Sequence, residues 1–137
     1  MNTEEELLRR YYDEVWVKGS TGVLDELLTE DYVDRTPPPG FDGSKETQKQ
    51  VVAFMRDTSS DKQLDLHVLV IDDEHAACYW TMEWTQRGDF FGTPADGKRL
   101  TMRGGDFYRL RDGRIAETWH VEDMLGIFMQ LGMTPKP

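Results

Sequence analysis

The sequence contains few or none of the residues that several kinds of site require. Cys78 is the one cysteine among 137 residues, which excludes an internal disulfide and a cysteine-based zinc site. The three histidines, His67, His75 and His120, lie in separate segments without a close-spaced pair, so we expect no metal centre. A net charge of −10, from 26 acidic and 16 basic residues, argues against nucleic acid as a partner, because phosphate binding needs clustered Lys and Arg.

Long apolar runs and targeting signals are also missing. No apolar stretch approaches the roughly 18–20 residues that a membrane-spanning helix needs. Acidic residues at positions 4–6 occupy the place where a signal peptide would carry basic ones. We therefore expect a cytoplasmic protein with no membrane partner. The sequence also has no nucleophile elbow, no glycine-rich phosphate loop and no Cys–His arrangement, so it gives no support for covalent catalysis.

What the chain does contain predicts a single domain over residues 1–137. Hydrophobic residues make up 38% of the sequence, with four Trp, five Tyr and six Phe, which is enough for a sizeable core. Helical periodicity predicts a first helix capped by Thr3 and ended by Gly19, a short second helix, and a third helix over 44–57. A short helix closes the chain. Period-two alternation predicts long strands over 64–71, 76–86, 100–110 and 113–123.

This order of elements predicts the fold class. Helices that precede a run of antiparallel strands indicate an α+β fold, with the N-terminal helices packed on one face of a curved, mostly antiparallel sheet. A long, strongly twisted sheet closed by helices forms a cone. The inside of a cone is a natural cavity for a hydrophobic small molecule, so candidate site residues are those that face inward.

Asp123 is the first candidate for a catalytic group. Alternation along the last strand puts Trp119, Val121 and Asp123 on one face and His120 on the opposite face. A carboxyl group on such an apolar face would be partly desolvated, which raises its pKa and allows proton transfer near neutral pH. The alternative is that Asp123 caps the helix that begins at Met124, and the pattern alone favours that cap.

Asp106 is the second candidate. Alternation over 100–110 points Asp106 inward, beside Tyr108, where a solvated carboxylate is unusual. The alternative is a bulge at Gly104 and Gly105 that would turn Asp106 to solvent. If Asp106 and Asp123 faced one cavity, their repulsion would raise one of the two pKa values.

Seven further residues are candidates for contact with a ligand. Tyr12, Trp16 and Trp80, like Trp84, would be core residues in the simplest interpretation, and would also form a pocket wall if they lay at the mouth of the cone. His120 could instead be a half-exposed strand histidine. Arg35 could bind a carbonyl or anionic oxygen, or could pair with Asp34 or Asp31 at the surface. The seven are Tyr12, Trp16, Arg35, Trp80, Tyr108, Trp119 and His120.

Four segments of the chain resemble one known family. They are LTEDYVD (28–34), FGTPADGKR (91–99), GGDFYRLRDGRIAETWHVED (104–123) and QLG (130–132). They are similar to the SnoaL-like polyketide cyclases, also called ester cyclases, of the NTF2-like superfamily. The chain departs from the family pattern at Arg35, where a histidine is common, and at 84–86, where WTQ replaces a Gly-Thr-His motif.

The resemblance implies a fold, an assembly and an activity. It implies the NTF2-like cone, a dimer or tetramer of identical chains built on the sheet, and no metal or organic cofactor. It also implies that Asp123 is the general acid/base for the intramolecular aldol closure of an aromatic polyketide ester, a lyase- or isomerase-type reaction. A substrate whose reacting carbon lies between carbonyl groups is already acidic, so one carboxylate in a dry aromatic pocket suffices.

We therefore expect a cofactor-free enzyme that acts on a hydrophobic, polyketide-like carbonyl or ester substrate, with Asp123 and Asp106 as catalytic residues. Two alternatives remain. In an epoxide hydrolase or dehydratase, Asp106 and Asp123 would hold a water molecule between them. In a non-catalytic small-molecule-binding module, the cavity would be shallow, filled by its own side chains or free of buried acids.

Overall fold

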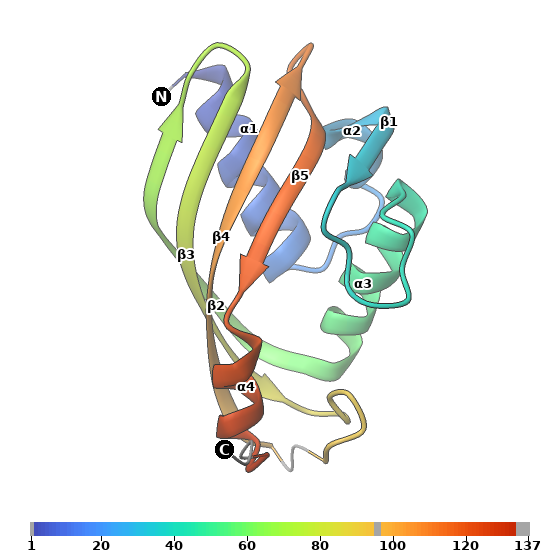
Figure 1. Ribbon diagram of the computed structural model, residues 1–137, viewed down its shortest axis with the longest axis vertical. Helices are drawn as coiled ribbons and strands as arrows, with labels where there is room; N and C mark the ends of the chain where they lie inside the picture. Colours follow the sequence, from blue (N-terminus) through green and yellow to red (C-terminus); the bar gives the residue numbers. More distant parts are fainter. Residues whose placement is uncertain (1, 95–96, 134–137) are drawn as a thin grey trace.

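The computed structural model describes residues 2–94 and 97–133 of the chain. One sheet of five strands, in the order β1-β5-β4-β3-β2, runs the length of the molecule (Figure 1). Strands β2 to β5 pair in antiparallel fashion, and β1 lies parallel to β5 at one edge, which confirms the prediction of a mostly antiparallel sheet in an α+β fold. The strands are β1 (Leu28–Asp34), β2 (Ser59–Ile71), β3 (His75–Gln86), β4 (Arg99–Arg111) and β5 (Arg114–Glu122).

Helices cover one face of the sheet and extend one of its ends. Helix α1 and the π-helix η1 form a continuous rod that crosses behind the sheet in Figure 1. Helices α2 and α3 lie beside β1, and α4 follows β5 at the lower end. None of the helices within the described ranges is long and apolar enough to cross a membrane. The helices are α1 (Thr3–Arg10), the π-helix η1 (Tyr11–Val17), α2 (Leu24–Leu27), α3 (Lys45–Thr58) and α4 (Met124–Gln130).

Local sequence signals explain where most of these helices begin and end. Ser44 caps α3 by accepting a hydrogen bond from the Thr47 N–H at 3.2 Å, and Gly19, with φ +75°, follows the first rod as predicted. The predicted Thr3 cap is wrong by one residue. The side chain of Asn2 accepts the N–H of Glu5 at 2.7 Å, and Thr3 is already helical.

The inner face of the sheet follows the predicted alternation on β3 and β4. Six alternate residues of β3 are buried, and β4 pairs with β3 in continuous register from Arg99 to Arg109. The bulge at Gly104 and Gly105, which was the alternative to an inward-pointing Asp106, is therefore absent, and Asp106 lies opposite Cys78 on the inner face. The six buried residues of β3 are Ala76, Cys78, Trp80, Met82, Trp84 and Gln86.

The inner face of β5 is the reverse of the one predicted. A register shift between Arg109 and Leu110 leaves Ala116 as an extra residue, since Leu110 pairs with Ile115 and Arg109 pairs with Glu117. One extra residue in a strand exchanges the two faces beyond it. Thr118, His120 and Glu122 therefore face the helices, whereas Trp119 and Val121 lie on the outer face with 36% and 68% of their surface exposed.

Candidate active site

Asp106 is a buried carboxylic acid at the centre of the inner face. It is 7% exposed, and the sheet register places it between Cys78 on β3 and His120 on β5. The prediction that Asp106 points inward is confirmed. An acid is rarely buried in this way without hydrogen-bonding partners, so its surroundings determine what it can do.

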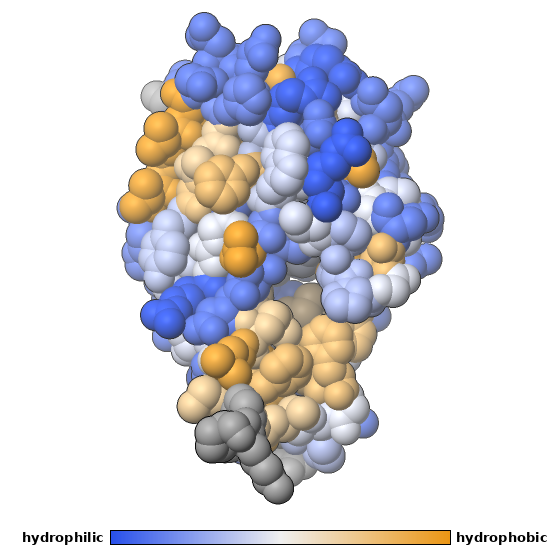
Figure 2. Space-filling model, in the orientation of Figure 1, coloured by the Kyte–Doolittle hydropathy of each residue, from blue (hydrophilic) through white to orange (hydrophobic). Residues whose placement is uncertain are grey.

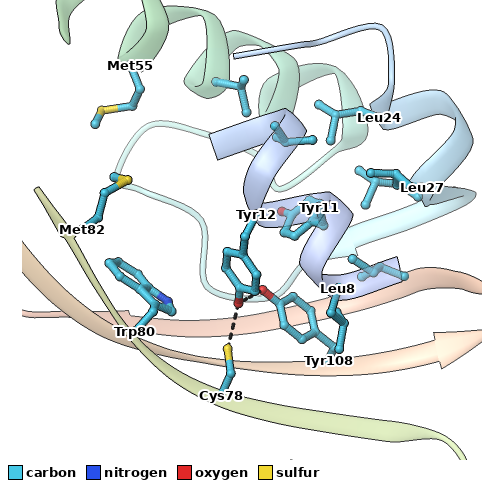
Figure 3. Packing of buried hydrophobic residues seen from close by; sticks show 14 of the residues in the cluster. Leu8, Tyr11, Tyr12, Leu24, Leu27, Met55, Cys78, Trp80, Met82 and Tyr108 are labelled. Atoms are coloured by element: carbon cyan, nitrogen blue, oxygen red, sulfur yellow. Dashed lines mark hydrogen bonds between the residues drawn. The ribbon is translucent and has the colours of Figure 1, made fainter. Parts of the chain in front are cut away.

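Four neutral groups donate hydrogen bonds to one oxygen of Asp106, the longest of them from the Cys78 thiol at 3.9 Å. Its Oδ2 accepts from the Tyr12 hydroxyl at 2.5 Å, the Trp80 indole Nε1 at 2.8 Å and the Tyr108 hydroxyl at 3.0 Å. The two tyrosine hydroxyls also contact each other, and the Cys78 thiol lies 2.7 Å from the hydroxyl of Tyr12 (Figure 3). Within the described part of the chain, no group donates to Oδ1, so this oxygen has no hydrogen-bonding partner there.

The surroundings raise the pKa of Asp106 above its usual range. Burial is the largest cause, and the negative charge of Glu122 adds to it, while the donors on Tyr12, Tyr108 and Trp80 lower the pKa and offset only part of the effect. Burial also raises the pKa of Tyr12 and Tyr108 well above that of a free tyrosine, and that of Cys78 to about 11. At neutral pH the hydroxyls and the thiol therefore keep their protons and remain donors.

Trp80 covers Asp106 on the side toward the α4 end of the sheet. This position depends on Gly104, the next inner-face residue along β4, because a Cβ atom there would lie 2.6 Å from Cζ2 of Trp80 and 2.9 Å from the Val121 carbonyl oxygen. The glycine lets the indole lie against the strand backbone. Figure 3 shows the indole nitrogen of Trp80 turned toward the tyrosine hydroxyls.

A second polar cluster lies beside Asp106 on the same face. The His120 ring is held between two carboxylates, with Nε2 2.8 Å from Oδ2 of Asp34 and Nδ1 2.5 Å from Oε1 of Glu122. Burial lowers the pKa of His120, but the hydrogen bonds and charges of Asp34 and Glu122 outweigh burial and raise the pKa to about 10. The ring is therefore an imidazolium at neutral pH. Within residues 2–94 and 97–133, no group of three or more acidic, histidine or cysteine side chains is arranged so that it could hold a metal ion.

Asp123 lies away from both clusters. Its Oδ1 accepts the N–H of Gly126 at 2.9 Å, which caps α4, and its Oδ2 lies 3.1 Å from Nε of Arg103, an exposed residue on the outer face of β4. The expected position of Asp123 on a desolvated inner wall is therefore wrong, because the bulge in β5 reversed the faces. The two acids do not share a cavity, so the arrangement in which Asp106 and Asp123 hold a water molecule lacks its geometric basis. The catalytic role expected for Asp123 stays a prediction.

The other candidate residues divide between the interior and the outer surface. Tyr12, Tyr108 and Trp80 surround Asp106, and Trp16 is half-buried with its ring edge-on to Tyr11. Two expected contact residues lie on the outside. Trp119 is on the outer face of β5, and Arg35, with 52% of its side chain exposed, pairs at 2.8 Å with Glu117 rather than with Asp34 or Asp31.

The surface beside the end of β5 is hollowed. Figure 2 shows a recess between the end of β5 and α3, with apolar side chains gathered below it around α4. Two other hollows, of about 550 and 320 Å³, lie on the outside of the molecule and include neither Asp106 nor Glu122. The first is lined entirely by polar and charged residues, among them Asp31 and Arg111, and is unsuited to a hydrophobic ligand.

Sequence reasoning missed two residues of the second cluster. Asp34, only 5% exposed, and Glu122 were not singled out, although the same alternation grouped Glu122 with His120 on one face. An acid two positions after a strand histidine was the available signal. The signal is weak because the more apolar face of β5, with Trp119 and Val121, is the outer one.

Comparisons with known proteins identify the family of this chain. The sequence profile of the SnoaL-like polyketide cyclases matches residues 6–131. Among solved structures, TsrD from Streptomyces laurentii is 27% identical, with a TM-score of 0.85 and 96% of each chain covered.

A proposed polyketide cyclase from Acidithiobacillus ferrooxidans is 25% identical, with a TM-score of 0.85, and 98% of this chain and 97% of that chain are covered. IdmH from Streptomyces antibioticus, also a proposed polyketide cyclase, is 25% identical, with a TM-score of 0.81 over 96% of this chain and 99% of that one. None of the curated proteins compared is significantly similar in sequence. The fold is NTF2-like, as the sequence predicted, and the chain belongs to the SnoaL-like polyketide cyclase family.

Proposed function

We propose that this protein is a cofactor-independent cyclase that catalyses acid/base, aldol-type ring closure on a hydrophobic polyketide-like carbonyl or ester substrate. The observation that carries the proposal is the buried carboxyl group of Asp106, bound by neutral donors alone on the inner face of the sheet. Membership of the SnoaL-like polyketide cyclase family, and the likeness to proposed cyclases, support the reaction class.

Asp106 is suited to proton transfer with a carbonyl substrate. Burial raises its pKa, so a larger share of the carboxyl group is protonated near neutral pH than in water. A protonated carboxyl group donates to a carbonyl oxygen and stabilises the enolate that forms when the neighbouring carbon loses a proton. The hydroxyls of Tyr12 and Tyr108 lie on the same carboxyl group and keep it in place.

The substrate in this proposal enters from the recess beside α4. The aromatic and apolar side chains around the recess suit an aromatic ligand, and they exclude water from the acid. Trp80 covers Asp106 from this side, so the indole must turn away for the substrate to reach the free Oδ1 oxygen.

Deuterium exchange tests the proposal directly. Ethyl benzoylacetate has an acidic carbon between two carbonyl groups, and proton NMR in D₂O follows the loss of its signal at mildly acidic pD, where spontaneous exchange is slow. We expect the protein to accelerate this exchange, and Asp106→Asn to reduce the acceleration by about 10²-fold or more, the usual contribution of a general acid or base. Asparagine keeps an acceptor for Tyr12 and Trp80 but cannot supply the proton.

Asp123→Asn is the matched variant, because its cap on α4 is retained while its charge is removed. Our proposal expects Asp123→Asn to keep the acceleration. If Asp123→Asn abolishes the exchange and Asp106→Asn retains it, the proton-transfer role belongs to Asp123, as first predicted from the family resemblance. If the wild-type protein does not accelerate exchange of this ester or of bulkier aryl β-keto esters, the enzymatic proposal fails in favour of a binding module.

We also propose that the outer face of the sheet binds a second copy of the chain. Apolar side chains from four strands are exposed there in two adjoining rows, and ion pairs between Arg109 and Glu117 and between Arg103 and Asp123 flank them. Positively and negatively charged residues both lie at the margins, so the charges on two copies of this face can complement each other. The exposed residues are Val68, Val70, Tyr79, Phe107, Trp119 and Val121.

Light scattering after size-exclusion chromatography tests this assembly. We expect wild-type mass above that of one 15.9 kDa chain, and the mass of one chain for Phe107→Glu. A charged residue at the centre of the apolar rows cannot be buried without a partner. A monomeric wild-type protein would rule out this use of the face.

A further inference from the structure

The cluster of Asp34, His120 and Glu122 is the strongest unassigned feature of the interior. Its members come from the end of β1 and from β5, and the register places His120 opposite Asp106 and Glu122 opposite Gly104 on β4. All of them therefore lie on the same face of the sheet as the proposed catalytic acid. No part of the proposed reaction has so far used them.

His120 cannot act as a base or bind a substrate oxygen in this arrangement. Both of its ring nitrogens face carboxylates, at 2.8 Å for Nε2 and 2.5 Å for Nδ1, so both carry hydrogens and both are occupied. The groups that face the ring are Asp34 from β1, Glu122 from β5 and Asp106 from β4. Burial disfavours the charged ring, but Asp34 and Glu122 favour it and raise its pKa to about 10.

Asp34 is the most buried member of the cluster, and both of its carboxylate oxygens are hydrogen-bonded. Its side chain is 5% exposed, and its Oδ1 accepts the N–H of Thr36 at 2.9 Å and the Thr36 hydroxyl at 3.3 Å. Its backbone N–H donates to the Gly43 carbonyl at 2.8 Å. With Oδ2 on His120, Asp34 has no free oxygen and little contact with solvent.

Glu122 is the most exposed member of the cluster. Only Oε1 is engaged, by His120, and within the described ranges no group donates to Oε2. About a quarter of its side chain is exposed (24%), against 16% for His120 and 5% for Asp34. Because Gly104, its partner across the strands, has no side chain, the space beside Glu122 is filled by the ring of Trp80, which also binds Asp106.

We propose that Glu122 is a second catalytic residue of this site, the base that removes the proton from carbon, and that His120 and Asp34 are positioning residues that hold it. The inference rests on the proposed function. Glu122 takes the proton from the carbon between two carbonyl groups, and the electron pair of that bond forms the new C–C bond to a further carbonyl carbon. The oxygen of that carbonyl takes the proton of Asp106, and solvent then returns the proton from Glu122 to Asp106.

The division of work follows from the different surroundings of the two acids. Asp106 is bound only by neutral donors and is buried, whereas Glu122 is bound by a cation and reaches solvent. When two carboxyl groups of one site lie in contrasting environments, one can act as the acid and the other as the base. Glu122 also acts on Asp106 directly, since its charge contributes to the raised pKa of that group.

Variants of Glu122 test the inference in the deuterium exchange of ethyl benzoylacetate. We expect Glu122→Gln to reduce the acceleration by about 10²-fold, because the amide can accept from His120 but cannot take a proton. Glu122→Asp, which restores the carboxylate on a shorter side chain, should recover part of the rate. Glu117→Gln is the matched control, since Glu117 is on the same strand but faces outward between Arg35 and Arg109, and it should leave the rate unchanged.

An NMR titration of the His120 ring separates positioning from simple structural support. We expect the ring to stay protonated up to at least pH 9 in the wild type, and Asp34→Asn to bring its titration closer to neutral pH and to change the pH profile of exchange. Wild-type exchange in Glu122→Gln, with exchange lost in Asp106→Asn, would overturn the inference and leave the proposed function intact. A His120 ring that titrates near pH 6.5 in the wild type would also overturn it. Failure of the wild type to accelerate exchange would overturn both.

Discussion

The charged His120 ring makes the stability of the folded chain depend on pH in a way that can be calculated. In the unfolded chain a histidine has a pKa of about 6.5, whereas Asp34 and Glu122 raise the pKa of His120 to about 10 in the folded chain. The stabilisation is therefore fully present below pH 6.5 and is lost as the pH rises through about 10. Between those limits the folded chain holds one more proton than the unfolded chain. Each increase of one pH unit therefore lowers the free energy of unfolding by about 1.4 kcal/mol.

Between pH 7 and pH 9 this amounts to about 2–3 kcal/mol, which urea unfolding measures easily. The perturbation is His120→Asn, which removes the titrating ring. Cys78, whose pKa is raised to about 11, also contributes a fall in stability toward the upper end of this range, but it is present in both proteins and cancels in their difference. We expect the variant to have a lower free energy of unfolding than the wild type at pH 7. The difference between the two free energies should shrink as the pH rises.

Urea unfolding at pH 7, 8 and 9, followed by circular dichroism at one protein concentration, provides the assay, because a constant concentration removes any contribution from assembly. Equal slopes of stability against pH in the wild type and in His120→Asn would refute the reasoning. Such a result would mean that the ring is not held as a cation between Asp34 and Glu122.

Three further predictions concern the packing and the two acids first expected to be catalytic. Gly104→Ala should destabilise the fold by about 1–3 kcal/mol in urea, because its Cβ would collide with the ring of Trp80, whereas Gly105→Ala, with its nearest contact at 3.4 Å, should change stability little. Asp123→Ala should lower stability by about 1 kcal/mol through loss of the cap on α4, and Asp123→Asn should retain most of it. Asp106→Asn should be at least as stable as the wild type at pH 7, because burial raises the pKa of Asp106 and the folded state loses stability as the carboxyl group ionises. Urea unfolding at pH 4 tests this reasoning, because any excess stability of Asp106→Asn over the wild type should be smaller at pH 4 than at pH 7.

Regular periodicity let the sequence predict most of the fold and one acid of the site. The alternation of apolar residues along β3 and β4 is unbroken, and those strands pair in continuous register, so the inner face and the burial of Asp106 followed from the pattern. The helices before the strands predicted the α+β class for the same reason. Helical periodicity predicted a helix that starts near Ser44, and local chemistry offered a cap as the alternative role of Asp123, which the structure shows.

The tertiary structure alone decided which face of β5 is inside. Ala116 is one extra residue relative to β4, and nothing in the local sequence marks it, yet it moves His120 and Glu122 inward and Trp119 outward. A bulge depends on the pairing of two strands, which alternation within one strand does not record. The pairing of His120 with Asp34 depends on it too, because these residues are 86 positions apart and meet only when β1 docks beside β5. The sequence determined that acids and aromatic residues would line a cone, and the register between strands determined which of them meet.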